Sequence, residues 1–406
     1  MNNFGTLYHY EVKKILSRKL VWIVFLICVV CAGMFASADL TGKYYVDGEV
    51  VDTHYHMFQV DQEYKRALSG RMLDRQLLEE MSAAYGKVPA AVDRYTLTEE
   101  YQTYARPYSD IFNIVRAWTQ QRGIDELKAW IPDEEALYTS RAESLGKVWQ
   151  ELRLSDAEKE FWREKEAQTD TPVMYLFHEG YSKLISNGMN TLGLLVLLFV
   201  CICMASVFTE EHTRRTDQLI LSGAKGKSAV YWAKLAAGAS VSAACAALLS
   251  VFVSVLVLVI YGAEGFQASL RISLYLWSSS CTMSLGQACL AAFGILILTA
   301  VFVGVLVLVL SEVLHSNIAT LSVCTGAIIA GMVGRIPDQY RVFAQVWDWL
   351  PMRFLNAEYI FDVRMLPLFG HCFVSWKVVP VLYVLTGVLA AMAGKVVYRN
   401  YQVCGR

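Results

Sequence analysis

FTEEHTRRTDQLILSGAKGKS, residues Phe208–Ser228, is the stretch that decides how the rest of the chain is arranged. It is charged, whereas the runs on either side, Thr191–Val207 and Leu235–Tyr261, are apolar and carry no formal charge. Such runs are typical of membrane spans, and two spans place the loop between them on one side of the bilayer. Short loops rich in Lys and Arg stay in the cytoplasm. The cations that predict this side are Arg214, Arg215, Lys225 and Lys227, with Lys234 just inside the next helix.

Part of this loop has a helical pattern. Leu219 and Ile220 recur beside Arg215 and Thr216 with the spacing of one helix face. We therefore expect a short helix over Thr216–Leu221 that lies against the cytoplasmic face and is available to a soluble partner.

The composition agrees with a membrane protein, because 55% of the residues are hydrophobic. Ten cysteines are present, most of them in or beside apolar runs, and none falls between Cys31 and Cys201. A disulfide framework is excluded in that interval. We expect these thiols to behave as small apolar side chains.

The N-terminal segment predicts a helix on the membrane surface followed by a first span. Residues 1–19 alternate apolar and cationic faces at helical spacing, and Leu20–Ala38 is an apolar run. Ala36-Ser37-Ala38 before Asp39 imitates a signal-peptide cleavage site. Because the basic region is unusually long and is itself a patterned helix, we expect an uncleaved span.

Residues 39–188 have the composition of a soluble, acidic, mostly helical domain. A segment this long escapes the positive-inside rule and is expected outside the cytoplasm. Thr96–Glu99 and Ser155–Glu158 match the capping box that begins a helix. Apolar residues from Phe58 to Met81 predict one helix, and Tyr44–Val46 with Val50-Val51 predicts a hairpin.

The remaining apolar runs complete an all-α membrane protein with six transmembrane helices. Its large, mainly helical extracytoplasmic insertion lies between helices 1 and 2, and both termini are cytoplasmic. The predicted parts are residues 1–38, 39–188 and 189–406, with the loop 208–228 in the third. The predicted spans are Leu20–Ala38, Met189–Phe208, Leu235–Tyr261, Met283–Leu310, Ile318–Val333 and Val378–Ala393.

Three other patterns carry little chemistry. Gly226-Lys227-Ser228 lacks the first glycine and the preceding strand of a phosphate loop, so a solvated basic turn is favoured. Asp52, His54 and His56 would share one face of a strand and could bind a metal, but an ordinary polar edge is favoured. Gln287 is the main polar side chain expected at membrane depth.

The predicted spans have no Asp, Glu, Lys or Arg near their centres. Ion-coupled transporters usually need an ionisable group there, so energy for any transport is expected to arrive through the cytoplasmic loop. The third span also holds a dense run of small residues, Ala236–Ala247. Small residues let helices approach closely, either within the chain or at a subunit interface.

Four segments together resemble the permease subunits of type 2 ABC transporters. They are YHYEVKKILSRKLVW, VFTEEHTRRTDQLILSGAKGKSAVYWAKL, VLVLVLSEVLHSNIATLSV and WLPMRFLNAEYI. In that family a Glu after the second span opens a coupling helix, and Glu210 or Glu211 would be that acid. Arg215-Thr216 stands where the family often has Gly-Thr. The resemblance covers residues 1–38 and 189–406, and some members carry a large outside insertion between them.

The resemblance implies a non-enzymatic subunit of a bacterial plasma-membrane exporter for an amphipathic cargo such as a peptide, a lipid or an antimicrobial compound. ATP and Mg²⁺ would bind a separate ABC ATPase, and this chain would hold no cofactor or metal. A second, identical or different permease and membrane lipid are the other implied partners, and nucleic acid is not. The implied ATPase-coupling residues are Glu210, Glu211, Arg214, Arg215, Thr216, Leu219, Lys225 and Lys227.

Two other classes remain open. The chain could be a membrane sensor or anchor whose outside domain binds a ligand or partner and whose loop signals inward. A membrane-embedded enzyme acting on lipids would need clustered His, Asp or Glu at membrane depth, which the sequence does not show. Co-purification with an ATPase, or with a kinase or regulator, distinguishes a transporter from a sensor.

Overall fold

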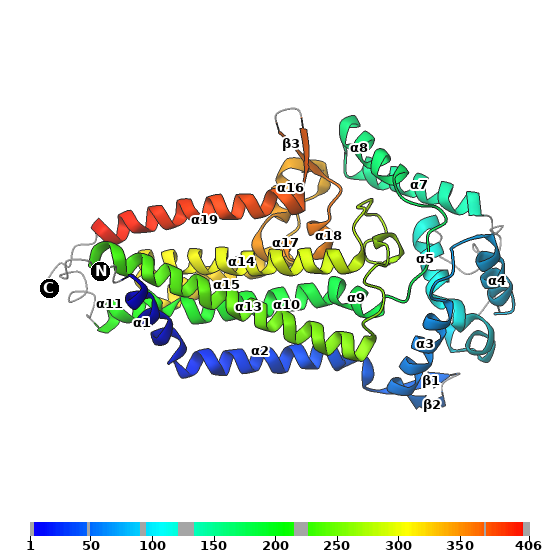
Figure 1. Ribbon diagram of the computed structural model, residues 1–406, viewed down its shortest axis with the longest axis horizontal. Helices are drawn as coiled ribbons and strands as arrows, with labels where there is room; N and C mark the ends of the chain where they lie inside the picture. Colours follow the sequence, from blue (N-terminus) through cyan, green and yellow to red (C-terminus); the bar gives the residue numbers. More distant parts are fainter. Residues whose placement is uncertain are drawn as a thin grey trace.

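The computed structural model describes residues 4–46, 49–89, 95–120, 134–214, 226–368 and 371–400. It is mostly helical and elongated, with long, nearly parallel helices in a bundle and shorter helices gathered at one end (Figure 1). Helix α1 and the end of α19 lie at the opposite end, which we call the base (Figure 1). The helices and strands between residues 43 and 178 form what we call the distal lobe.

The bundle contains long helices and shorter helices that connect them. Its long members are α2 (Lys19–Ser37), α10 (Met189–Met204), α13 (Tyr231–Tyr261), α14 (Leu285–Leu314), α15 (Asn317–Val333) and α19 (Ser375–Asn400). Its short members are α1 (Phe4–Leu16), α9 (Glu179–Lys183), α11 (Ser206–Arg214), α16 (Arg341–Asp348), α17 (Pro351–Phe354) and α18 (Ala357–Ile360).

Among the described residues, five helical stretches are long and apolar enough to cross a membrane. They are Lys19–Leu40, Glu179–Glu211, Ser228–Tyr261, Leu285–Leu314 and Ser375–Asn400. This is the architecture of an all-α, multi-pass membrane protein, as the sequence predicts. The five stretches overlap the predicted first, second, third, fourth and sixth spans.

The predicted fifth span corresponds to α15, which at 1.5 Å per residue is roughly 25 Å long. The chain then bends by 113° into Asp338–Asp348, the segment that contains α16. If this bent pair is counted as one broken span, the described residues hold six candidate spans; the sequence predicts the fifth span from Ile318–Val333 alone.

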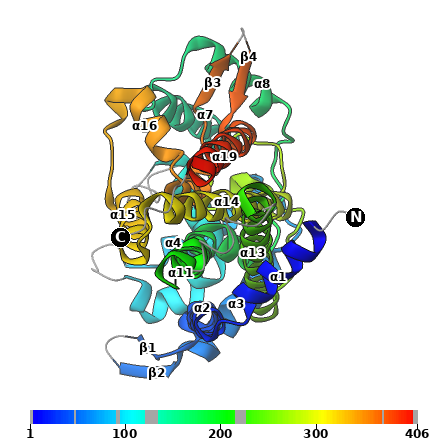
Figure 2. The same ribbon diagram turned by 90° about the vertical axis from the view of Figure 1, so that its left-hand side faces the viewer.

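Helix α14 is the centre of the bundle, with α10, α13, α15 and α19 packed around it (Figure 2). Its buried face includes the small residues Thr299, Ala300 and Gly304. A Cβ added to Gly304 would lie 2.6 Å from the Oγ of Ser242 on α13. Glycine is therefore required here, because α13 and α14 approach each other closely.

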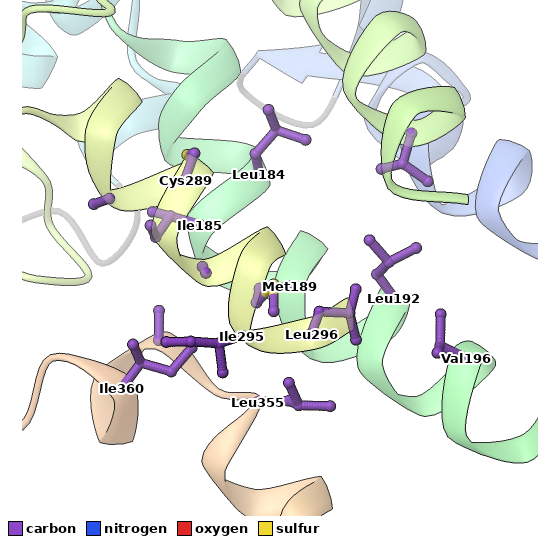
Figure 3. Close-up of a cluster of buried hydrophobic side chains, with 14 of the residues drawn as sticks. Leu184, Ile185, Met189, Leu192, Val196, Cys289, Ile295, Leu296, Leu355 and Ile360 are labelled. Atoms are coloured by element: carbon purple, nitrogen blue, oxygen red, sulfur yellow. The ribbon is translucent and has the colours of Figure 1, made fainter. Parts of the chain in front are cut away.

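A cluster of buried apolar side chains joins α10, α14 and the segment of α17 and α18 near the lobe end of the bundle (Figure 3). Met189 of α10, Leu296 of α14 and Ile360 of α18 are all at most 1% exposed. A Cβ on Gly193 would lie 3.0 Å from Leu355, so this glycine lets the short helices reach α10. The segment after the 113° bend is therefore packed into the bundle.

The distal lobe begins with an antiparallel hairpin, which confirms the predicted one. Its strands are β1 (Lys43–Val46) and β2 (Glu49–Thr53). The helices that follow are α3 (His54–Leu68), α4 (Arg75–Gly86), α5 (Ser109–Thr119), α7 (Glu134–Glu151) and α8 (Asp156–Ala167). A second hairpin, β3 (Met365–Leu368) and β4 (His371–Val374), comes from the segment before α19.

The prediction of one helix from Phe58 to Met81 is wrong, because α3 ends at Leu68 and α4 begins at Arg75. Gly70 has φ +90°, a conformation that residues with a side chain rarely adopt. Asp74 then caps α4 by accepting a hydrogen bond from the amide of Leu77 at 3.0 Å. The turn at Gly70 and the cap at Asp74 separate the two helices, although the apolar residues keep their helical spacing across the break.

Of the two predicted capping boxes, the one at Ser155 is confirmed. Its hydroxyl accepts from the amide of Glu158 at 3.4 Å, and the Glu158 carboxylate accepts from the Ser155 amide at 2.7 Å. The box predicted at Thr96 is wrong, because Thr96 lies within a short helical turn. Thr98 accepts a hydrogen bond from the amide of Tyr101 at 3.3 Å in its place.

Two further interpretations of polar residues change with the structure. Asp52 is on β2 but His54 and His56 are on α3, so the three do not share a strand face. The part of the chain that the structure describes holds no cluster of three or more His, Cys, Asp or Glu fit for a metal. Gln287 is at the first turn of α14 and not near its middle, where it completes a capping box with Ser284.

Charged side chains attach the distal lobe to the loop between α13 and α14. Glu166, just before the end of α8, accepts from Arg141 of α7 at 3.2 Å and pairs with Arg271 of that loop at 3.1 Å. The indole of Trp118 donates to the carbonyl oxygen of Arg271 at 3.0 Å. Both arginines are almost fully buried, and their lost hydration is compensated by the Glu166 carboxylate and by two carbonyl oxygens, that of Trp277 for Arg141 and that of Glu166 for Arg271.

A second set of contacts attaches α8 to the segment before α19. The Glu158 carboxylate pairs with Arg341 and accepts from the amide of Met365 at 2.8 Å, and Trp162 donates to the carbonyl of Val363 at 2.7 Å. Burial by itself raises the pKa of Glu158, but these hydrogen bonds to its charged form hold the pKa below its ordinary value.

Candidate functional site

Four of the residues with the predicted coupling role are described by the structure, and they belong to α11 or to the turn before α13, at the base of the bundle (Figure 1). Glu210 and Glu211 lie on α11, and their side chains are described. Arg214 ends α11 and Lys227 lies in the turn before α13, but the structure describes only their backbone. The predicted helix Thr216–Leu221 lies outside the described residues, as do the four predicted residues Arg215, Thr216, Leu219 and Lys225.

Glu211 belongs to a buried ion-pair cluster, which we call the basal cluster and define as Glu11, Lys14, Glu211 and Lys234. The Nζ of Lys234, on α13, lies 2.5 Å from Oε1 of Glu211 and 3.1 Å from Oε2 of Glu11. Glu211 also pairs with Lys14. Of the two α1 residues, Glu11 therefore contacts Lys234 and Lys14 contacts Glu211. Two acids and two lysines make the cluster neutral.

Burial makes these pairs important for stability. The Lys234 side chain is 0% exposed and that of Glu211 is 7% exposed, whereas Lys14 is 38% exposed. A charge that leaves water without a partner is strongly unfavourable. The Lys234 ammonium also lies 5.4 Å from the centre of the Phe208 ring, which adds a cation–π contact. Lys234 is therefore held by α1 and α11 together.

Glu210 points to a different partner. It pairs with Arg18 at 2.8 Å, and the same guanidinium donates to the hydroxyl of Ser206 at 2.6 Å. Arg18 is the residue that precedes α2, so this contact holds α11 at the junction of α1 and α2. Two consecutive acids thus connect α11 to three neighbouring helices.

Aromatic rings join α19 to the same region. Tyr231 lies 5.4 Å from Tyr398 and 6.0 Å from Phe208 between ring centres, and its hydroxyl donates to the carbonyl of Ala391 at 2.7 Å. Aromatic pairs at these distances stabilise packing beyond the area they bury. The basal ends of α11, α13 and α19 are therefore packed as one unit.

The small-residue run on α13 divides between a buried face and a face that lines a groove. Ala237 and Gly238 are buried inside the bundle, so they support packing within the chain. Ala236 and Ala239 instead line an apolar groove of about 610 Å³ between α13, α14 and α19. The groove also has Phe302 and Tyr383 stacked in its lining, with ring centres 4.5 Å apart.

Sequence reasoning found the acids of α11 but missed their partners. It placed Lys234 among the cations of the loop, and Glu11 and Lys14 on the polar face of the first helix. One signal was present, because Lys234 is the single formally charged residue within Tyr231–Tyr261. A lone charge in an apolar helix indicates a buried partner or a functional contact.

Comparison with known protein families, with curated proteins and with solved structures gives no match. The functional argument therefore rests on the residues themselves and on their contacts at the base.

Proposed function

We propose that the chain is the membrane-spanning permease subunit of an ATP-driven type 2 ABC exporter. ATP would be hydrolysed in a separate ATPase chain that docks on the connection between α11 and α13 at the cytoplasmic face. Cargo would be amphipathic, because the predicted spans are apolar and uncharged near their centres. A peptide, a lipid or an antimicrobial compound fits this description.

The basal cluster is the observation that carries the proposal. A segment that receives movement from a partner must be rigidly connected to the helices that it moves, and α11 meets this requirement through Glu210 and Glu211. A displacement of α11 would be passed to α1, to the junction with α2, and to α13. Rigid-body movement of packed helices is a common form of such transitions.

Two permease subunits and two ATPase subunits would form the working assembly. The groove lined by Ala236 and Ala239 supports a second permease at α13 and α19, because small residues allow helices of separate chains to approach. Closure of the ATPase pair on ATP would then move the bundles between inward-facing and outward-facing forms.

Purification from native membranes in mild detergent tests the proposal. The expected result is an ATPase with Walker motifs that co-purifies, and ATP-dependent transport after both chains are reconstituted. A kinase or regulator in place of the ATPase would favour the sensor interpretation. Transport by the chain alone on an ion gradient would overturn the proposal.

Two variants separate docking from transmission. Charge reversal of Arg214 and Arg215 is expected to weaken capture of the ATPase. Lys234→Met is expected to leave capture intact but to reduce the stimulation of ATP hydrolysis by cargo, because Lys234 is fully buried and pairs with Glu11 and Glu211 inside the bundle.

A further inference from the structure

A polar cavity of about 380 Å³ lies between the distal lobe and the ends of the membrane helices. We call it the junction cavity. The lobe contributes Lys65 of α3 and Asp110 of α5, and the bundle contributes α9, the end of α13 and part of the loop that follows it. The lining side chains used below are Asp39, Lys65, Asp110, His178, Glu179, Ser182, Lys183 and Ser273.

The cations of the cavity are already paired. Lys183 lies 2.6 Å from Asp39, and Lys65 lies 3.3 Å from Glu179. The third carboxylate, Asp110, accepts a hydrogen bond from the hydroxyl of Tyr175 at 2.5 Å. Three carboxyl groups and two ammonium groups line the cavity, so its formal charge is −1 when His178 is neutral.

Asp110 is charged despite its burial. Burial acts to raise its pKa, but the ammonium of Lys65, the protonated form of His178 and the hydrogen bond from Tyr175 hold the pKa below its ordinary value. The pKa of His178 is also lowered, but here burial is the cause, since it disfavours the charged ring more than Asp110 favours it. At neutral pH the cavity therefore contains a carboxylate beside a neutral imidazole.

The imidazole offers an acceptor. Nδ1 of His178 lies 2.7 Å from the carbonyl oxygen of Leu176, which requires a proton on Nδ1. Nε2 of the neutral ring is then an acceptor.

Two serine hydroxyls in the lining have unused hydrogen-bonding capacity. Ser273 is 1% exposed, and its Oγ has no hydrogen-bond partner among the described residues. The Oγ of Ser182 is likewise buried and has no hydrogen-bond partner among the described residues. Buried polar groups of this kind are normally satisfied, so two unpartnered hydroxyls in the lining of one cavity indicate a polar occupant.

We propose that the junction cavity binds a compact primary ammonium group. Its positive charge would balance the excess carboxylate, and its N–H groups would donate to the serine hydroxyls and to Nε2 of His178. An anion is disfavoured because both lysines are paired. A metal ion is disfavoured because the described residues provide no cluster of three ligands. This inference does not depend on the transport function.

The ammonium has two possible sources, a free small amine or the ethanolamine headgroup of a lipid in the adjoining leaflet. The first arm of the test uses the full chain in detergent micelles, with thermal unfolding followed by tryptophan fluorescence. Ethanolammonium chloride should raise the Tm saturably, because a ligand that binds only the folded state stabilises it. Tetramethylammonium chloride at equal ionic strength has no N–H donor and should not.

Ser273→Ala should weaken ethanolammonium binding about tenfold, since it removes one hydrogen bond to a charged group. Ser280→Ala is the matched control, because Ser280 is also 1% exposed and unpartnered but does not line the cavity. Asp110→Asn keeps an acceptor for Tyr175 and should weaken binding by about tenfold or more. Failure of this variant to fold would leave the comparison of the serine variants intact.

The second arm uses nanodiscs of phosphatidylethanolamine or phosphatidylcholine. A higher Tm in phosphatidylethanolamine that Ser273→Ala abolishes and Ser280→Ala retains would identify the lipid as the source. Ethanolammonium binding without a lipid effect would identify a free amine. Equal shifts with both ammonium salts, equal behaviour of the two serine variants, or no shift in either arm would overturn the proposal and leave a water-filled cavity.

Discussion

Replacing Lys234 with methionine tests whether the basal cluster is a buried ionic connection. The side chain keeps most of its unbranched length but loses its charge, and Glu211 and Glu11 lose the ammonium that lies 2.5 Å and 3.1 Å away. Removing one partner of a buried pair costs about 3–5 kcal/mol, because the other charge stays buried and uncompensated. Lys14 still pairs with Glu211 and is partly solvated, so the lower end of this range, about 3 kcal/mol, is expected.

The assay is the free energy of unfolding, measured by denaturant titration in mild detergent. Lys13→Met is the matched control, because Lys13 is next to Lys14 of the cluster on α1 but is exposed, and it should change stability by no more than about 0.5 kcal/mol. The double variant Lys234→Met with Glu211→Met should recover at least half of the loss, since apolar pairs often replace buried ion pairs without penalty.

Two results would refute this reasoning. If Lys234→Met were as stable as Lys13→Met, the cluster would not be desolvated. If the double variant were no more stable than Lys234→Met, the loss would come from packing of the lysine stem and not from the stranded carboxylate.

Three further predictions concern coupling, topology and pH. Reversing the charges of Arg214 and Arg215 should weaken capture of the ATPase and so reduce ATP-driven transport without loss of expression, and unchanged capture and transport in reconstituted vesicles would contradict the docking role. A cysteine at Ala142, an exposed position on α7, should react with an impermeant maleimide on intact cells, whereas labelling only after lysis would invert the topology. The pKa of Glu158 is held below its ordinary value, so its contribution to stability is present above the unfolded pKa and is lost as the pH falls through the folded pKa. The fluorescence of buried Trp162 should therefore change reversibly in that acid range, and Glu158→Gln should remove the transition; an identical transition in the variant would assign it elsewhere.

The features that the sequence predicted well are those with a local physical cause. Long apolar runs become helices because every backbone group must be satisfied within the segment, and five such runs are helices here. The capping box at Ser155 and the first hairpin also depend only on neighbours in the chain. The failed helix from Phe58 to Met81 shows the limit, since its apolar period persists across the turn at Gly70.

The contacts of the candidate site could not be predicted in the same way, because they join distant parts of the chain. Lys234 meets Glu211 across 23 residues and Glu11 across 223. A helical pattern states which face of α1 is polar, but not which charge on another helix will meet it.

One inference was nevertheless available from the sequence of α13. A lysine in an otherwise uncharged apolar helix must find a carboxylate or remain at the membrane surface, and Lys234 is fully buried. Of the acids at the basal ends of neighbouring helices, those of α11 stand nearest in sequence, beside the loop that we propose as the docking site. The same charge that must be neutralised for the bundle to be stable therefore connects the docking segment to the helices that it would move.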